Sequence, residues 1–362
     1  MFSPVPPGND SPNDRFRILT VDGGGIRGLI SALTIAELEK RIKARAGEKA
    51  LISDYFHLFA GTSTGGLIAL SLTAPGGVTA EELASFYTED GPTIFRRDLS
   101  RRLTTLGGLI GPKYSLAPLQ GAVEKRLGDA RIKSALRDIV VTSYDMTGRE
   151  PYFFKRWRAR ESDDRNSPIV DAALATAAAP TYFPSHEHRG RALVDGGVFA
   201  ANPVVAAIAE ALKRSEDEPA NLTGDDLLVV SIGTGEHETG FPPGEVSKWG
   251  KLGWIVPKGD DPPILGAVLG GTADAADHWA HTLLNHPTGP PDPADIGRGR
   301  RFFRWQAKLA AQVGMDDTSR ETLEDVLPAA ASELIATRDA ELDEIADRLT
   351  KFDPLPPDPP SS

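Results

Sequence analysis

A serine between two glycines, at the end of an apolar run, most strongly constrains how this chain can fold. The stretch from Phe56 to Leu67 begins as a short apolar run, continues as Gly61-Thr-Ser63-Thr-Gly65 and leads into an apolar helical pattern. We predict a buried strand, a tight turn and a helix, with the Ser63 hydroxyl exposed over the helix N-terminus. Gly61 and Gly65 would let the backbone pass close to Ser63. The alternative is an ordinary turn whose serine caps the helix.

A glycine loop earlier in the chain repeats this arrangement. A predicted strand at 16–21 is followed by Asp22-Gly-Gly-Gly-Ile-Arg-Gly28 and by an amphipathic helix at 29–45. Two such units in succession indicate a parallel sheet with crossover helices. Amides without side chains can converge on one oxygen, so this loop is a candidate oxyanion site, in which the arginine either neutralises a substrate phosphate or braces the loop. The candidate residues are Gly23, Gly24, Gly25, Arg27 and Gly28.

Asp195 is the candidate general base for Ser63. It directly follows a short predicted strand at 192–194 and precedes Gly196 and Gly197, so we expect its carboxylate at the rim of the sheet. A carboxylate needs only a modest pKa shift to act as a base toward a hydroxyl whose alkoxide is stabilised nearby. The alternative is a turn aspartate that caps its own backbone.

Two other functional hypotheses fit parts of the pattern. In an α/β-hydrolase, a serine and an aspartate are followed along the chain by a histidine, but the available histidines lie in a helical pattern instead of after a strand. These are His278, His281 and His286. The loop at 22–28 also fits the dinucleotide fingerprint, although the acidic residue expected at the end of the next strand is absent.

Composition excludes several classes of function. The chain has 362 residues, a formal net charge of −11 and no cysteine. Thiol chemistry is therefore excluded, and a general nucleic-acid binder would usually be basic. No apolar run approaches the roughly 20 residues of a membrane span, and the N-terminus lacks a signal-peptide pattern. We expect a cytoplasmic protein with no cofactor or metal.

The remaining segments define the expected domain organisation. We predict a disordered lead at 1–14, a catalytic core at 15–240, a mostly helical extension at 241–352 packed on the core, and a disordered tail at 353–362. A hairpin is expected around Thr147-Gly148, and a basic loop at 91–115 near the active face or as a solvated connection.

Two clusters in the extension have open interpretations. Trp249, Trp254 and Ile255 either form an interfacial loop or pack the extension onto the core. A basic-aromatic cluster at 298–305, which contains a candidate strand, either binds a phosphate-bearing regulator or forms a solvated strand face. Its arginines are Arg298, Arg300, Arg301 and Arg304.

Three signatures in order resemble those of the patatin-like phospholipases: Asp22-Gly-Gly-Gly-Ile-Arg-Gly28, Gly61-Thr-Ser-Thr-Gly65 and Asp195-Gly-Gly197. The stretches at 175–180 (ATAAAP) and 228–235 (LVVSIGTG) are also similar. The resemblance covers about residues 15–235, and Asp-Gly-Gly replaces the commoner Asp-Gly-Ala.

The resemblance implies a three-layer α/β/α fold and hydrolysis of acyl esters of glycerophospholipids at a membrane surface. It implies a Ser63–Asp195 dyad, with the oxyanion bound by amides of the first loop. Some bacterial relatives are lipases activated by cyclic oligonucleotides in anti-phage defence. This chain is similar to them in size and in its first motif, so a small cyclic nucleotide is a possible partner. Oligomeric state, cleaved acyl position and head group stay open.

Overall fold

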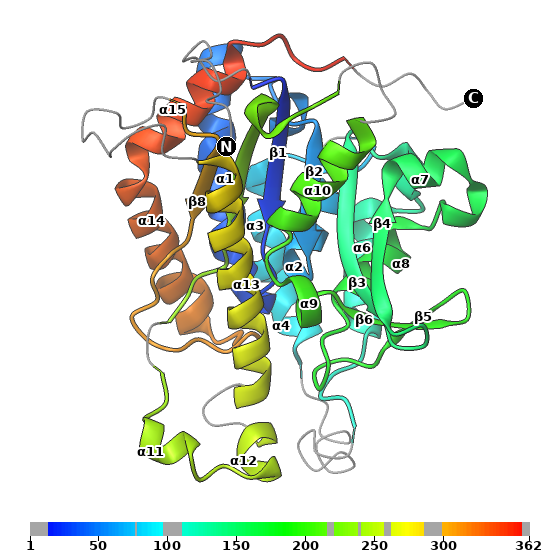
Figure 1. Cartoon of the computed structure of the whole chain (residues 1–362), viewed down its shortest axis with the longest axis vertical. Helices are drawn as coiled ribbons and strands as arrows, with labels where there is room; N and C mark the ends of the chain where they lie inside the picture. Colours follow the sequence, from blue (N-terminus) through cyan, green and yellow to red (C-terminus); the bar gives the residue numbers. More distant parts are fainter. Residues whose placement is uncertain are drawn as a thin grey trace, which may run out of the picture.

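One mixed sheet forms the centre of the molecule (Figure 1). The computed structural model describes residues 14–76, 78–96, 111–215, 221–237, 240–256, 262–285 and 299–356. Within these ranges the sheet has eight strands, in the order β5-β6-β3-β2-β1-β7-β8, and β4 also pairs with β3. The strands are β1 (Phe16–Val21), β2 (Leu58–Thr62), β3 (Asp138–Asp145), β4 (Glu150–Lys155), β5 (His186–His188), β6 (Arg191–Asp195), β7 (Leu227–Ile232) and β8 (Phe302–Trp305).

The five strands from β3 to β8 in this order are parallel, whereas β4, β5 and β6 pair antiparallel with their neighbours. The β3–β4 hairpin confirms the turn predicted around Thr147-Gly148. The central strands are buried on both faces, which explains their nearly continuous apolar sequences. The expectation of a mainly parallel sheet is confirmed.

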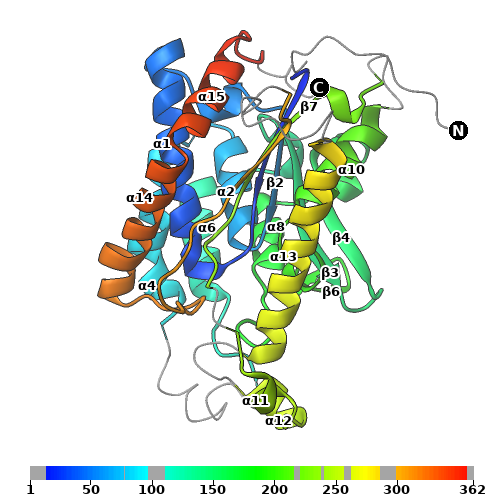
Figure 2. The same ribbon diagram turned by 60° about the vertical axis from the view of Figure 1, so that its left-hand side comes forward.

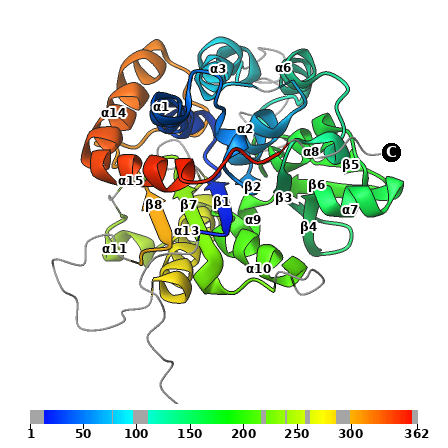
Figure 3. The same ribbon diagram turned by 90° about the horizontal axis from the view of Figure 1, so that it is seen from above.

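Helices cover both faces of the sheet (Figure 2, Figure 3). One core lies between the sheet and α10 and α13; the other lies between the sheet and α1, α2, α8, α14 and α15. The expected three-layer α/β/α architecture is therefore present. The helices are α1 (Gly28–Ala46), α2 (Thr64–Thr73), α3 (Ala80–Ser85), α4 (Gly91–Ile94), α6 (Ala117–Leu127), α7 (Arg156–Glu161), α8 (Ile169–Thr176), α9 (Gly197–Ala200), α10 (Val204–Ser215), α11 (Pro243–Val246), α12 (Lys251–Ile255), α13 (Pro263–Leu284), α14 (Leu327–Thr337) and α15 (Asp339–Thr350).

Residues after 240 contribute a strand to the central sheet as well as helices. β8 extends the sheet by pairing in parallel with β7, and Trp305 at its end is 0% exposed. The Trp305 indole donates a hydrogen bond to Glu341 of α15, and α14 and α15 lie along α1. The sheet is therefore continuous across the boundary that we expected near residue 240.

Both ends of the described chain make contacts with the rest of the protein. Asp14 is buried and receives two hydrogen bonds from the Arg348 guanidinium. Arg137 donates hydrogen bonds to the carbonyls of Leu355 and Pro356, which holds the first residues of the expected tail. Asp14 and the residues at 355–356 thus contact the folded part of the chain. The rest of the lead (1–13) and of the tail (357–362) lies outside the described residues.

No helix in the described ranges combines the length and apolar character needed to cross a bilayer. The expected basic loop at 91–115 lies partly outside the described residues, which omit 97–110.

We predict that Trp305→Ala lowers the free energy of unfolding by about 3–5 kcal/mol, because it removes a large buried side chain from the sheet. Trp279→Ala on α13 is the matched control: that indole is 56% exposed, so its loss should change the free energy by less than about 0.5 kcal/mol. Urea unfolding followed by circular dichroism measures both. Equal effects of the two changes would contradict the integration of β8 into the core.

Candidate active site

Ser63 lies at a strained turn between β2 and α2. Its φ and ψ are 54° and −123°, a backbone conformation that is costly for a residue with a side chain. The chain passes so close to itself here that a Cβ at Gly61 would lie 2.1 Å from the Gly65 carbonyl oxygen, and a Cβ at Gly65 would lie 2.1 Å from that of Val21. The two glycines are therefore required by packing. The turn places Ser63 at the N-terminus of α2, where the helix dipole favours negative charge.

The pairing of two strands with β3 brings Asp195 to this turn. Thr62 ends β2 and pairs with Thr142, and Asp195 ends β6 and pairs with the next residue, Ser143. Because β4 occupies the other edge of β3 opposite these residues, β2 and β6 must share one edge. β2 is parallel to β3 and β6 is antiparallel, so the carboxyl ends of β2 and β6 point toward each other.

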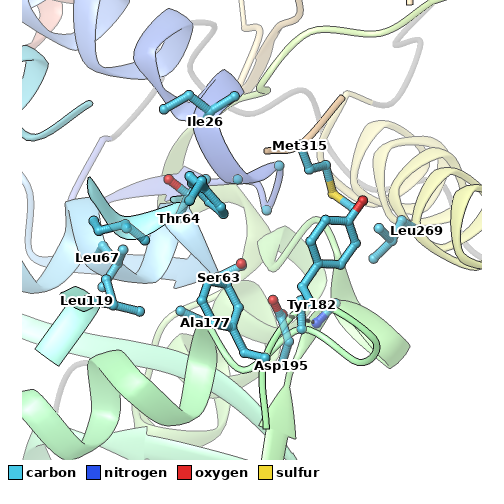
Figure 4. Close-up of a pocket in the computed structure, with 18 of the residues that line it drawn as sticks. Ile26, Ser63, Thr64, Leu67, Leu119, Ala177, Tyr182, Asp195, Leu269 and Met315 are labelled. Atoms are coloured by element: carbon cyan, nitrogen blue, oxygen red, sulfur yellow. Dashed lines mark hydrogen bonds between the residues drawn. The ribbon is translucent and has the colours of Figure 1, made fainter. Parts of the chain in front are cut away.

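Asp195 is only 5% exposed, and its Oδ1 atom accepts a hydrogen bond of 2.7 Å from the Gly197 amide. Burial raises the pKa of Asp195 to about 6, while hydrogen bonds from the Ser63 side chain and the Gly197 amide limit the increase. In Figure 4 the Ser63 hydroxyl and the Asp195 carboxyl lie side by side at the edge of one pocket. The pair has the geometry and the protonation equilibrium of a nucleophile and a base that work near neutral pH.

The glycine loop at 22–28 faces the same pocket, but only part of it has free amides. The Gly23 amide donates to the Ala201 carbonyl at 2.9 Å. The Arg27 amide donates to the Gly24 carbonyl at 3.3 Å, and the Gly28 amide donates within the same turn. The candidate oxyanion donors are therefore fewer than the five residues that the sequence pattern suggested.

The amides of Gly24 and Gly25 have no acceptor among the described residues, and both glycines line the pocket. A Cβ at Gly24 would lie 2.2 Å from Thr234 Oγ1, and one at Gly25, whose φ is +61°, would lie 2.2 Å from the Met315 carbonyl oxygen. Two free amides beside Ser63 form a suitable oxyanion site. The Arg27 side chain braces this loop, since its Nε donates to the Gly24 carbonyl at 3.4 Å.

Asp22, which begins the glycine loop, is bound by an arginine that lies 282 residues later in the chain. Arg304 on β8 donates a hydrogen bond of 2.5 Å to Asp22 Oδ2 and one of 3.0 Å to Ser231 Oγ. Burial raises the pKa of Asp22, and the Arg304 guanidinium counteracts this effect. Arg304 thus has a structural partner instead of a solvated or ligand-facing position.

The other described arginines of the basic-aromatic cluster are also engaged. Arg300 pairs with Glu341 at 3.0 Å, and Arg301 binds the Asp225 carbonyl and pairs with its carboxylate. The described guanidinium groups therefore neutralise acids and cap carbonyls within the protein. Arg298 lies outside the described residues.

The pocket has a volume of about 830 Å³, its open mouth included. Its polar end holds Ser63, Asp195, Gly24 and Gly25, and the rest is almost entirely apolar (Figure 4). Apolar side chains from both halves of the chain line it: Ile26, Leu67, Phe86, Ile94, Phe95, Leu119, Phe183, Leu265, Leu269 and Met315. A long apolar group bound here would carry its reacting carbonyl beside Ser63.

The two alternative hypotheses find little support at this pocket. No histidine in the described ranges lines it, and His278 and His281 lie on α13. His286 is outside the described residues. An apolar lining also suits a fatty-acyl chain better than a nucleotide.

Thr176 is a functional candidate that sequence reasoning missed. Its Oγ1 atom, fully buried at the end of α8, accepts a 2.9 Å hydrogen bond from the Ser63 amide. The motif at 175–180, which contains Thr176, could have identified it. In the sequence analysis this motif supported the family resemblance, but none of its residues was given a role. Thr176 fixes the strained backbone at Ser63.

Comparison with known proteins gives a consistent result. The family model of the patatin-like phospholipases matches residues 19–208. Patatin-like protein 2 of Oryza sativa subsp. japonica is 35% identical over 339 residues, or 86% of this chain and 81% of that protein. Patatin-like protein 2 of Arabidopsis thaliana is 35% identical over 285 residues, or 72% and 70%. Among solved structures, VipD from Legionella pneumophila aligns over 92% of this chain and 67% of its own, with a TM-score of 0.47 and 13% identity.

We predict that Thr176→Val lowers the free energy of unfolding by about 1–3 kcal/mol, because it leaves the partly buried Ser63 amide without this acceptor. Thr176→Ser keeps the hydroxyl and is the matched control. Chemical denaturation of the three proteins gives the comparison. If valine and serine are equally tolerated, the hydrogen bond does not stabilise the turn.

Proposed function

Because the chain belongs to the patatin-like phospholipase family, a family of lipid acyl hydrolases, we propose that it cleaves acyl esters of glycerophospholipids with Ser63 as nucleophile and Asp195 as base. The observation that carries this proposal is the convergence of the ends of β2 and β6 on one edge of β3, which places the two side chains at one apolar pocket. Nothing beyond these two side chains is needed to move the proton.

The proposed reaction has two steps. Ser63 Oγ attacks the ester carbonyl while Asp195 accepts the hydroxyl proton, and the amides of Gly24 and Gly25 bind the resulting oxyanion. Collapse of the intermediate breaks the ester bond, and Asp195 returns the proton to the leaving alcohol or lysolipid. Water then attacks the acyl-serine with Asp195 again as base, which releases the fatty acid and restores Ser63.

We predict that Ser63→Ala and Asp195→Asn each lower kcat for ester hydrolysis at least about 1,000-fold, because each removes one of two groups that act together. Asparagine keeps an oxygen that can accept from the Gly197 amide, so the loop should stay folded. Turnover of a phospholipid and of a soluble short-chain ester measures the effect.

Ser71→Ala on α2 is the control, since this serine does not line the active-site pocket. It should retain normal turnover. Near-normal activity of either dyad variant would eliminate the proposed mechanism, and activity lost on changing His278 or His281 to alanine would favour the α/β-hydrolase alternative.

The pKa of Asp195 predicts the pH profile. The base must be ionised to accept a proton, and burial raises its pKa to about 6. We therefore expect kcat/KM to be constant above about pH 7 and to fall toward tenfold per pH unit below 6. A profile measured on a soluble ester, with circular dichroism at each pH to exclude unfolding, tests this. A plateau that continues to pH 4.5 would rule out Asp195 as the base.

An apolar projection next to the pocket supports action at a membrane surface. α11 and α12 extend from the end of the molecule where α13 begins (Figure 1), and the nearby residues Leu265 and Leu269 of α13 line the pocket. On α12, Leu252 is 75% exposed and Ile255 is 52% exposed. Trp249 contacts Phe241 and Trp254 edge to face, and neither tryptophan belongs to the two hydrophobic cores. We propose that α12 inserts into the lipid interface.

We expect Leu252→Asp/Ile255→Asp to weaken vesicle binding at least about tenfold, because it removes two apolar side chains from the proposed interface. Hydrolysis of a soluble ester should not change. Leu283→Asp, at the other end of α13 and 53% exposed, is the matched control. Co-sedimentation with phospholipid vesicles and the tryptophan emission maximum report binding. Equal losses in both variants would exclude α12 as the docking element.

Activation by a cyclic oligonucleotide and a role in anti-phage defence remain proposals that rest on the resemblance of size and first motif to such relatives. A cytoplasmic location is a separate proposal that does not rest on this resemblance. The described arginines of the cluster at 298–305 already bind protein groups, so an activator that bound them would have to compete with those contacts. Phospholipid hydrolysis with and without a set of cyclic di- and trinucleotides tests the proposal, and equal rates throughout would contradict it.

A further inference from the structure

Three side chains with metal-binding groups converge where α8 packs against the β5–β6 hairpin. Asp171 lies on α8, and His186 and His188 lie on β5. His186 Nε2 is 3.3 Å from Asp171 Oδ1, and His188 Nδ1 is 3.3 Å from Asp171 Oδ2. One ligand atom from each of the three residues lies within 4.8 Å of the others.

The local fold explains why the two histidines face the same way. β5 and β6 form a hairpin whose turn residues Arg189 and Gly190 both have positive φ, at 51° and 73°. Side chains alternate between the faces of a strand, so His186 and His188 point to α8 while Glu187 is exposed on the other face.

Two further features are typical of a set of metal ligands. Ser167 Oγ lies 3.0 Å from Nε2 of His188, the ring nitrogen opposite the one that faces Asp171. A partner on the second nitrogen orients the ring and selects its tautomer, as occurs for metal-bound histidines. His186 Nε2 is buried, and its 3.3 Å contact with Asp171 Oδ1 does not have the geometry of a hydrogen bond.

Two of the three spacings match those around a small tetrahedral ion. Each histidine nitrogen lies 3.3 Å from one of the two carboxylate oxygens of Asp171, and one ligand atom from each residue lies within 4.8 Å of the others. Ligands at about 2.0–2.1 Å from a tetrahedral zinc ion lie about 3.3 Å apart, and two imidazoles with one carboxylate form a known type of zinc ligand set. We propose that Asp171, His186 and His188 bind one divalent transition-metal ion of the zinc class, with water as the fourth ligand, and that this ion clamps α8 to the β5–β6 hairpin.

The clamp would join two elements that shape the candidate active site. α8 ends at Thr176, which accepts a hydrogen bond from the Ser63 amide, and the hairpin ends at Asp195. The ion would thus hold both elements without touching the substrate. That the ion supports catalysis by holding these two elements rests on the proposed function. Binding of the ion itself does not.

The test uses the full-length, tag-free protein after treatment with a chelator. Titration with Co²⁺, followed by its visible absorption, and competition with Zn²⁺ give the stoichiometry and the affinity. We expect one equivalent with the intense bands of a tetrahedral site, and a higher Tm in the presence of Zn²⁺.

Variants then locate the site. Asp171→Asn and His186→Gln should each weaken Zn²⁺ binding at least tenfold and abolish the rise in Tm. Ser167→Ala keeps all three ligands and should weaken binding about 10–100-fold. His278→Gln changes an exposed histidine on α13 and should leave binding intact. Circular dichroism confirms that each variant is folded.

The outcomes are distinct. If the wild type lacks saturable one-to-one binding, or if Asp171→Asn and His186→Gln retain it, the metal site is overturned and the cluster is a hydrogen-bonded carboxylate–imidazole group. Binding without a change in Tm overturns the clamp. Metal stoichiometry does not depend on turnover, so failure of the hydrolase proposal would leave this result unaffected.

Discussion

The shared edge of β3 is the constraint on which the candidate site depends. β2 covers the first part of that edge and β6 the last part, so one strand must end where the other ends. β1 adds the third component, because Val21 pairs with Gly61 and the glycine loop leaves the sheet at the level of the serine turn. Hydrogen bonds of the sheet, instead of flexible side chains, thus determine where Ser63, Asp195 and the glycine loop lie.

Burial of charge is the energetic consequence of this arrangement. An ionised Asp195 in an apolar pocket is costly, and its raised pKa records that cost. Nearby, buried Asp22 is compensated by Arg304 across 282 residues of sequence. The same environment that disfavours the two carboxylates makes Asp195 a stronger base and strengthens any hydrogen bond made to an oxyanion.

Local sequence signals explain which features could be predicted. Glycines next to Ser63 and Asp195 mark strand ends where the backbone is crowded, so these residues could be located without a structure. β5 could not, because three residues, His186–His188, are too short for an alternation of apolar and polar side chains to be recognised. Two hydrogen bonds of the site depend on distant segments packing together. The Ser63 amide donates to Thr176, and the Gly23 amide donates to the Ala201 carbonyl. The local sequence pattern does not predict such contacts.

The pocket draws its walls from opposite ends of the chain, which has a consequence for biosynthesis. Ser63 and Asp195 leave the ribosome well before Leu265, Leu269 and Met315, which line the pocket beside them. A nascent chain that ends before Met315 therefore presents Ser63 and Asp195 in an unfinished cleft. The apolar pocket, and with it the capacity to enclose a fatty-acyl chain, is complete only after these later residues have been made and packed in place.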